Sequence, residues 1–323
     1  MKKGILLINL GGTPVAPTAA AVRPYLRRFL GDPRVIAMPR LLWKPILELM
    51  ILPKRPAASA KMYQAIWSQD YGSPLAYYTQ KQATRLQALL PDRIVKYAFS
   101  YSAPFIPEVL REFAREQVEE LTIIPLYPQY STTTVGSVTD EITAFYHKST
   151  FVPNLRVVTS FYQAPDYIEV LAAKIKNAWQ QKHYDKLLLS YHGIPESYVA
   201  KGGDPYARQC HATTQLLREK LGTIPVLETF QSKFGRAKWL EPATDHTLKS
   251  LPQTGIKNVL VVSPAFVSDC LETLHELQLE NREYFMSAGG QTYDVVPCLN
   301  DDEDFIKVLK NLAVAPADQH ALR

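Results

Sequence analysis

The sequence predicts an α/β protein with two similar doubly wound, Rossmann-like domains, each with a four-stranded parallel sheet flanked by helices. Short runs rich in β-branched residues alternate with longer segments of helical periodicity, which is typical of βαβ units. The 323 residues also exceed the length at which one hydrophobic core usually stops growing. We therefore expect domains over residues 1–153 and 154–323, with an active site between them, and a last helix that can pack back on the first domain.

The first half begins with a buried strand at residues 4–10, and the glycines and proline of residues 11–14 predict a sharp turn after it. Thr18 is a good N-cap residue for the helix that follows, and Gly31 is a typical helix end. Further helices are expected at residues 57–67, 77–90 and 107–117, and further strands at 95–99, 121–124 and 155–160.

Residues 38–56 (MPRLLWKPILELMILPKRP) are apolar on nearly all sides and have basic ends. Their short length and internal Pro45 exclude a transmembrane helix, which leaves a buried segment, a hydrophobic lid or an interfacial helix. We expect a hydrophobic lip that covers a bound ligand and makes transient contact with a membrane surface, because the apolar residues exceed what one helix face can bury.

The second half repeats the alternation. Strands are expected at residues 186–191, 226–229, 258–263 and 293–296, and helices at 165–181, 206–221, 244–251, 270–286 and 303–312. Ligands bind at the carboxyl ends of strands in open parallel sheets, so the segments directly after strands are candidate sites.

Composition narrows the class of protein. Apolar residues make up 46% and charged residues 21%, as in ordinary globular proteins, and the net charge of +5 comes without a basic run, so we expect no nucleic-acid partner. The 3 cysteines are too widely spaced to indicate a disulfide framework or an iron–sulfur cluster. We find neither a signal peptide nor a bilayer-spanning run. A cytoplasmic monomer is expected, with peripheral attachment at the inner membrane face as an option.

A row of carboxylates runs through residues 263–280 (SPAFVSDCLETLHELQLE). Glu272, Glu276 and Glu280 recur at steps of four, so an α-helix would place them along nearly one face, where like charges repel. One interpretation is a solvated polar stripe. The other is a row of oxygen ligands or proton acceptors that forms a path for a cation or a proton.

His192 follows the buried strand at residues 186–191, and Glu272 follows the strand at 258–263, so both side chains are expected at one edge of a sheet. Imidazole plus carboxylate suits a divalent borderline metal, and it also suits proton removal from a weakly basic nitrogen. A nucleotide cofactor is not expected, because neither the Gly-x-Gly-x-x-Gly fingerprint nor a Gly-Lys-Ser/Thr ending is present.

Taken together in this order, the motifs make the sequence resemble the bacterial ferrochelatases, which insert Fe²⁺ into a porphyrin in the terminal steps of haem synthesis. The resemblance covers essentially the whole chain. It rests on INLGGTP, LLWKPILELMILPKRP, GSPL, FSYSAP, LYPQYSTTTVGS, LLLSYHGIP, FQSKFGRAKWLEPATD and SPAFVSDCLETLHELQLENRE.

The resemblance implies a chelatase-type fold and roles for individual residues. His192 and Glu272 match the catalytic and metal-site pair of the family, and Glu276 and Glu280 match a carboxylate trail credited with proton or metal traffic. In the family this helix carries a π-type distortion. The positions that line the porphyrin pocket in relatives correspond here to Asn9, Leu10, Tyr63, Ser73, Tyr101, Tyr130, Trp239 and Phe266.

The resemblance also implies a lyase-class enzyme with Fe²⁺ as a substrate, no nucleotide and no iron–sulfur cluster. Relatives specific for coproporphyrin have a Tyr near the position of Leu10, so its absence favours protoporphyrin IX. Coproporphyrin III ferrochelatase is the first alternative, and a sirohydrochlorin or cobalt chelatase is the second. Other members have Arg where this chain has Ser100 or His where it has Cys270, so propionate recognition is expected to rely on other groups.

The substrate's chemistry implies the mechanism we expect. A porphyrin holds two N–H protons inside a flat ring, so the enzyme must distort the ring and remove both protons before a metal enters. His192 and Glu272 are expected to share proton removal and metal binding, and the sequence does not assign one role to each.

Overall fold

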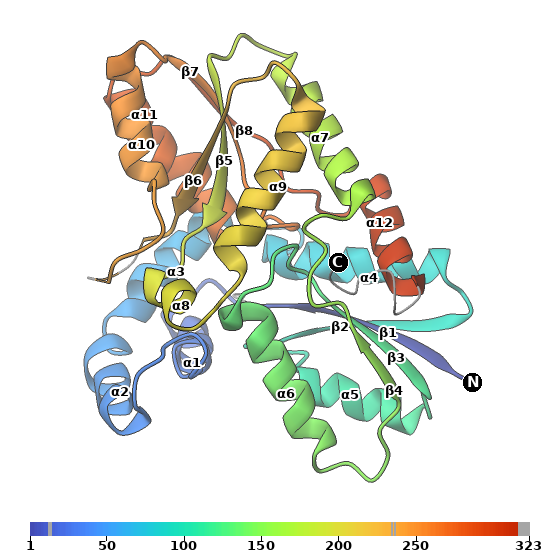
Figure 1. The fold of residues 1–323 in the computed structure, drawn as a ribbon. Coiled ribbons are helices and arrows are strands. Elements are labelled where there is room, and N and C mark those ends of the chain that lie inside the picture. Colours follow the sequence, from blue (N-terminus) through green and yellow to red (C-terminus); the bar gives the residue numbers. More distant parts are fainter. Residues whose placement is uncertain (12–14, 234, 236, 316–323) are drawn as a thin grey trace. The chain divides into compact units, whose positions relative to one another are not determined.

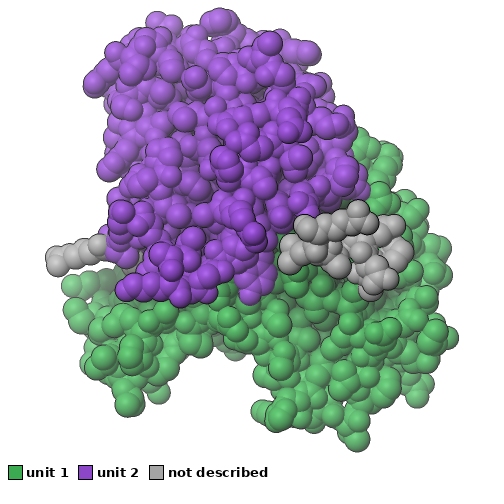
Figure 2. Space-filling view, in the orientation of Figure 1, with its two compact units in different colours: residues 1–127, 131–160, 301–323 green, residues 128–130, 161–300 purple. Residues whose placement is uncertain are grey.

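The computed structural model describes residues 1–11, 15–233, 235 and 237–315 (Figure 1). Most of the turn expected at residues 11–14 lies outside them. The chain divides into two compact units (Figure 2): unit 1 comprises Met1–Tyr127, Ser131–Ser160 and Asp301–Arg323, and unit 2 comprises Pro128–Tyr130 and Phe161–Asn300. Each unit contains one parallel four-stranded sheet with helices on both faces, so the predicted fold class is confirmed.

The unit boundaries differ from the expected division at residue 153. Strand β4 (Asn154–Val157) belongs to unit 1, because it pairs in parallel with β3 (Glu120–Pro125) of the first sheet. The last helix, α12 (Glu303–Val314), also belongs to unit 1, where it packs against α4 (Pro74–Leu89) and β3. Residues 128–130 belong to unit 2, because Gln129 donates a hydrogen bond to Thr213 Oγ1 at 3.0 Å.

Unit 1 is organised around β1 (Lys3–Asn9), which pairs with β2 (Arg93–Phe99) on one side and β3 on the other, in the order β2-β1-β3-β4. The central residues of β1, Ile5 to Ile8, are completely buried, as their unbroken apolar run predicts. Helices α5 (Ile106–Arg115) and α6 (Ser137–Tyr146) cover one face of the sheet, and α4 and α12 cover the other (Figure 1). Helix α6 was not predicted, since a run of β-branched threonines precedes it in the π-helical turn Thr132–Gly136.

Most of the described residues between β1 and α4 form helices and helical turns. Thr18 caps α1 (Ala19–Phe29), as predicted, by accepting the Ala21 N–H at 3.3 Å. The apolar segment then forms α2 (Arg40–Ile46), a π-helical turn (Leu47–Ile51) and the start of α3 (Arg55–Ile66). Apolar residues lie on both the buried and the exposed sides of this segment, as expected of a sequence with more apolar residues than one helix face can bury.

The apolar side chains of residues 38–56 differ sharply in their exposure to solvent. Trp43 and Leu47 are 7% and 4% exposed, and the Trp43 indole donates to the Leu30 carbonyl at 2.6 Å. Leu41 and Leu49 are 91% and 75% exposed, and Leu42 and Met50 are also exposed. An exposed apolar surface therefore lies on a helix pair that is anchored in the core by its other side. No helix among the described residues is long and apolar enough to cross a bilayer.

Unit 2 has the strand order β6-β5-β7-β8, formed by β5 (Lys186–His192), β6 (Val226–Gln231), β7 (Asn258–Val262) and β8 (Thr292–Val295). Helices α7 (Pro165–Trp179) and α9 (Tyr206–Leu221) cover one face, and α10 (Thr244–Ser250) and α11 (Arg282–Ser287) cover the other (Figure 1). Two shorter elements, α8 (Glu196–Ala200) and a 3₁₀ turn (Leu251–Thr254), complete the unit.

The helix expected at residues 270–286 forms, but its first ten residues, Glu272–Asn281, are π-helical rather than α-helical. A π-helix closes i→i+5 hydrogen bonds, so its turns are wider than those of an α-helix. Thr273, Leu277 and Asn281, four residues apart, are the buried positions of this stretch. The three glutamates, each one residue earlier, therefore follow the edge of the buried side.

Candidate functional site

His192 is the last residue of β5, not the first residue after the strand, and it is half-buried. Its Nδ1 lies 2.6 Å from the carbonyl oxygen of Gly193, so the neutral ring carries its proton on Nδ1 and donates it to that oxygen. The lone pair of Nε2 is then available to accept a proton or to bind a metal. Burial lowers the pKa of His192, and the negative charge of Glu272 offsets part of this effect, so the imidazole is neutral at physiological pH.

Glu272 begins the π-helical stretch beyond the carboxyl end of β7. Its backbone carbonyl accepts a hydrogen bond of 3.1 Å from Nε2 of Gln231, the last residue of β6. Gln231 is also the register partner of His192 in the sheet. His192 and Glu272 follow the carboxyl ends of adjacent strands, so both residues lie at the same edge of this sheet.

Glu276 is held by the residue that follows β6. One carboxylate oxygen accepts the Ser232 N–H at 2.6 Å, and the other accepts the Ser232 hydroxyl. Ser232 has a φ of 65°, an uncommon backbone conformation for a residue other than glycine, and this lets its N–H and hydroxyl reach the same carboxylate. Burial raises the pKa of Glu276 to about 7, although these hydrogen bonds oppose the rise.

Glu280 has a different environment. Its side chain is 43% exposed, and Oε1 lies 3.5 Å from Nδ1 of His275, which is only 16% exposed. The row of acids thus leads from a carboxylate beside His192, through a mostly buried one, to an exposed one.

Two of the aromatic candidates in unit 2 lie next to His192. The Phe266 ring is 6.1 Å from the His192 ring, centroid to centroid. Trp239 packs on Gly193, where a Cβ atom would lie 3.3 Å from the indole ring and 2.8 Å from the Gln231 carbonyl oxygen, so glycine is required. Tyr130 contacts α9, because its N–H donates to Gln209 Oε1 at 2.7 Å.

The candidates in unit 1 form a second group. The Tyr101 N–H donates to the Leu10 carbonyl at 3.2 Å, and the Ser100 N–H donates to the Asn9 carbonyl at 3.3 Å, so the segments after β1 and β2 are joined. The Asn9 side chain accepts from the Leu10 N–H and donates to Thr79 of α4 at 3.2 Å.

The other two unit 1 candidates lie on neighbouring helices. Ser73 is the buried residue that precedes α4. Tyr63 is buried on α3 with its ring edge against Tyr25. Ring contacts link Tyr63 to Tyr101, because Tyr25 also packs against Phe29, and Phe29 packs against Tyr101 at 5.3 Å between ring centroids.

Sequence reasoning missed Gln231 and Ser232, which position the acids of the π-helical stretch. Both residues lie in the quoted motif FQSKFGRAKWLEPATD, so the motif was a signal, but the positive φ of Ser232 cannot be read from residue types. Among the described residues, no group of three or more His, Cys, Asp or Glu side chains is arranged to hold a metal ion.

The fold is that of the chelatases. The structure is similar to SirB from Bacillus subtilis with Fe³⁺, with a TM-score of 0.58 at 12% identity over 97% of this chain and 96% of that one. It is also similar to CbiX, titled the terminal enzyme for biosynthesis of siroheme in denitrifying bacteria, with a TM-score of 0.52 at 14% identity over 96% and 97% of the two chains.

The family follows from sequence similarity. A family model described as Ferrochelatase matches residues 2–316. The chain is 47% identical over 311 residues to the coproporphyrin III ferrochelatase of Enterococcus faecalis, which covers 96% of this chain and 98% of that protein. It is 49% identical over 313 residues to the coproporphyrin III ferrochelatase of Lactococcus lactis, over 96% of both chains. It is 46% identical over 321 residues to the ferrochelatase of Teredinibacter turnerae, over 97% and 87%.

This chain belongs to the ferrochelatase family. It is a metal chelatase of the lyase class, and it acts in haem biosynthesis. The resemblance drawn from its motifs is therefore confirmed.

Proposed function

We propose that this chain inserts Fe²⁺ into coproporphyrin III, and that protoporphyrin IX is the second candidate substrate. The supporting observation is that relatives named coproporphyrin III ferrochelatase align with 96–98% of their own length at 47–49% identity. Relatives named simply ferrochelatase align at 45–46% identity with 85–87% of theirs. Leu10, in place of a tyrosine, is the residue that favours protoporphyrin IX.

The proposed chemistry removes two N–H protons from the porphyrin as one Fe²⁺ enters, so the charge on the macrocycle core is balanced. His192 Nε2 accepts a pyrrole proton or binds the iron, and Glu272 takes the complementary role. The support for this pair is the Nδ1 contact with Gly193, which orients the imidazole, together with the low His192 pKa, which keeps it neutral.

Glu272, Glu276 and Glu280 form the proposed route by which protons or metal ions travel. Glu276, with a pKa of about 7, exchanges protons readily near neutral pH, and Glu280 is exposed. Protons can therefore pass from Glu272 to Glu276 and then to solvent at Glu280. Residues 38–56 are proposed to act as a lip over the flat apolar face of the macrocycle, with transient contact to a membrane surface through Leu41, Leu42, Leu49 and Met50.

The test is a direct metallation assay. The protein is mixed anaerobically with Fe²⁺ and, separately, with coproporphyrin III, protoporphyrin IX or sirohydrochlorin, and the visible spectrum is followed without added nucleotide. We expect the largest kcat/KM with coproporphyrin III. A larger value with protoporphyrin IX would reverse the order of the two candidates, and conversion of sirohydrochlorin alone would refute both.

A further inference from the structure

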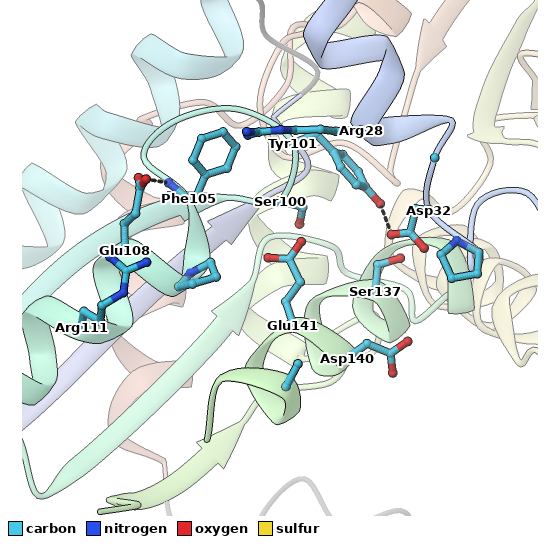
Figure 3. Close-up of a pocket in the computed structure, with 14 residues that line it drawn as sticks. Arg28, Asp32, Ser100, Tyr101, Phe105, Glu108, Arg111, Ser137, Asp140 and Glu141 are labelled. Atoms are coloured by element: carbon cyan, nitrogen blue, oxygen red, sulfur yellow. Dashed lines mark hydrogen bonds between the residues drawn. The ribbon is translucent and has the colours of Figure 1, made fainter. Parts of the chain in front are cut away.

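Tyr101, a proposed porphyrin-binding residue, is fixed in place by Asp32. The ring is 4% exposed, and its hydroxyl donates a hydrogen bond of 2.7 Å to Asp32 Oδ2 (Figure 3). A tyrosine ring that binds a flat macrocycle must be held at a defined position, and a bond to a charged acceptor is stronger than one between neutral groups. The carboxylate of Asp32 therefore sets the position of the Tyr101 ring.

Asp32 is itself held from a second direction. Its other oxygen, Oδ1, accepts the Arg34 N–H at 2.7 Å. The Arg34 guanidinium binds both carboxylate oxygens of Asp140 on α6, each at 2.7 Å, and Thr132 Oγ1 at 3.0 Å. The segment that carries Asp32 is thus tied to α6, and a movement of α6 would be transmitted to Tyr101.

A cavity of about 630 Å³ lies beside this chain of contacts. Asp32 and Tyr101 line it, and so does Glu141 of α6, whose carboxyl group points toward Ser100 in Figure 3. The Ser100 hydroxyl is buried and has no hydrogen-bond partner among the described residues. A protonated Glu141 can offer it a donor, whereas an ionised Glu141 adds a second negative charge beside Asp32.

Glu141 changes its charge near neutral pH. Burial raises its pKa to about 7, the charge of Asp32 adds to the rise, and Arg28 opposes it. The charged and titratable groups that line the cavity with it are Arg28 of α1, Asp32 of the following segment, Tyr101, Glu108 and Arg111 of α5, and Asp140 of α6. Asp140 is already paired with Arg34, so the repulsion felt by an ionised Glu141 is mainly from Asp32.

We propose that Asp32 is a positioning residue for Tyr101 in porphyrin binding, and that Glu141 makes this positioning sensitive to pH near neutrality. The inference rests on the proposed function and on the expectation, from the family resemblance, that Tyr101 lines the porphyrin pocket. When Glu141 is neutral, Asp32 holds the Tyr101 hydroxyl without repulsion. When Glu141 is ionised, the two carboxylates repel each other, and the anchor of Tyr101 is displaced.

The experiment measures kcat and KM for porphyrin between pH 6 and pH 8, together with porphyrin affinity by fluorescence quenching. Asp32→Ala should raise KM about tenfold with little change in kcat, because a bond to a charged acceptor is lost. Asp32→Asn can keep both contacts, because its amide oxygen accepts the Arg34 N–H and its amide N–H donates to the Tyr101 hydroxyl oxygen, and it should stay within about twofold of the wild-type KM at pH 7. In the wild type KM should rise from pH 6 to pH 8, and Glu141→Gln should remove that rise.

Glu108→Gln is the matched control. It removes a charge from the same cavity, and a glutamine still accepts the Phe105 N–H that Glu108 binds at 3.0 Å. It should keep the wild-type dependence of KM on pH. If Asp32→Ala folds and binds porphyrin like the wild type, the positioning role is wrong. If Asp32→Ala fails to fold, Tyr101→Phe, which removes the hydroxyl that Asp32 binds, should raise KM in the same way, and an unchanged KM refutes the positioning role. An Asp32→Asn variant that keeps the wild-type pH profile refutes the part played by Glu141. Failure of the wild type to metallate or bind any porphyrin would instead refute the proposed function.

Discussion

His192 shows how a single residue gains its chemistry from three neighbours. Gly193 fixes the tautomer through its carbonyl oxygen, Glu272 supplies a nearby negative charge, and burial keeps the ring neutral. The sequence predicts the residue and its place at the end of a strand. The tautomer and the depressed pKa depend on the packing around it.

We expect His192→Ala to reduce metal insertion by at least about 100-fold, because a positioned proton acceptor contributes roughly this factor or more. The fold should be retained, since the side chain is half-buried at a strand end, and circular dichroism checks this. His183→Ala is the control, because the His183 side chain is 82% exposed in the same unit and should leave turnover unchanged. Near-normal turnover of the His192 variant with both Fe²⁺ and Zn²⁺ would contradict the assignment.

The environments of Glu276 and Glu280 distinguish the two interpretations of the carboxylates at Glu272, Glu276 and Glu280. The interpretation as a solvated stripe suits Glu280, which is 43% exposed. It does not suit Glu276, whose carboxylate accepts hydrogen bonds from the backbone and the side chain of Ser232.

We expect Glu276→Gln to slow turnover and leave porphyrin affinity nearly unchanged, because Glu276 is proposed to transfer protons or metal ions and not to bind the porphyrin. A proton acceptor must be ionised, so the wild-type rate should rise with pH as Glu276 deprotonates around its pKa of about 7. The variant should lack this rise in a pH–rate profile. Glu283→Gln, an exposed position on α11, is the control, and an identical profile for both variants would argue against the proposed path.

At the scale of an element, residues 38–56 illustrate how packing divides a uniformly apolar sequence. Trp43 and Leu47 point into unit 1, whereas Leu41, Leu42, Leu49 and Met50 are exposed. A segment that contacts a bound porphyrin or a membrane needs exposed apolar side chains on a helix whose other side is anchored in the core. Residues 38–56 have both features.

We expect a change of Leu41, Leu42 and Leu49 to Ser to raise the KM for porphyrin and reduce sedimentation with anionic liposomes, while the melting temperature stays nearly constant. The exposed side chains contribute little to the core, so stability should not fall. The comparison variant combines Trp43→Ser with Leu47→Ser. Its free energy of unfolding should fall by several kcal/mol, because both changes remove buried apolar contacts. A normal KM and normal liposome binding in the first variant would exclude the lip.

The π-helical stretch Glu272–Asn281 is the element that sequence periodicity describes least well. A spacing of four is compatible with both an α-helix and a π-helix, because both keep such residues near one side. Periodicity therefore does not distinguish the wider helix, whereas the family resemblance implied a π-type distortion here, and the structure has one at Glu272–Asn281.

At the scale of the whole chain, two buried carboxyl groups make stability depend on pH. The pKa values of Glu141 in unit 1 and Glu276 in unit 2 both rise from 4.5 to about 7. A carboxyl group whose pKa is raised on folding contributes stability that is fully present below its unfolded pKa and is lost as pH rises through the folded pKa. Each shift corresponds to about 3 kcal/mol at most, and solvent screening lowers that figure.

We therefore expect the melting temperature to be lower at pH 8 than at pH 6, and we expect Glu141→Gln combined with Glu276→Gln to narrow the difference. Asp185 and Asp294 have lowered pKa values, so their contribution is lost only in acid and stays constant over this range. Thermal unfolding at the two pH values provides the measurement. If the melting temperature falls by the same amount between pH 6 and pH 8 in the wild type and in the double variant, other groups control the pH dependence of stability.

Local periodicity and turn residues were sufficient to predict the strands of both sheets, most of the helices and the parallel α/β class, because neighbours along the chain encode these features. The sequence also indicated His192 and the three glutamates, since chemistry-bearing residues that follow buried strands are visible in one dimension. Three features became visible only in the folded chain: residues 128–130 belong to unit 2, Ser232 holds Glu276, and Asp32 holds Tyr101. These facts depend on partners tens of residues away or more, and on backbone angles that residue types do not specify.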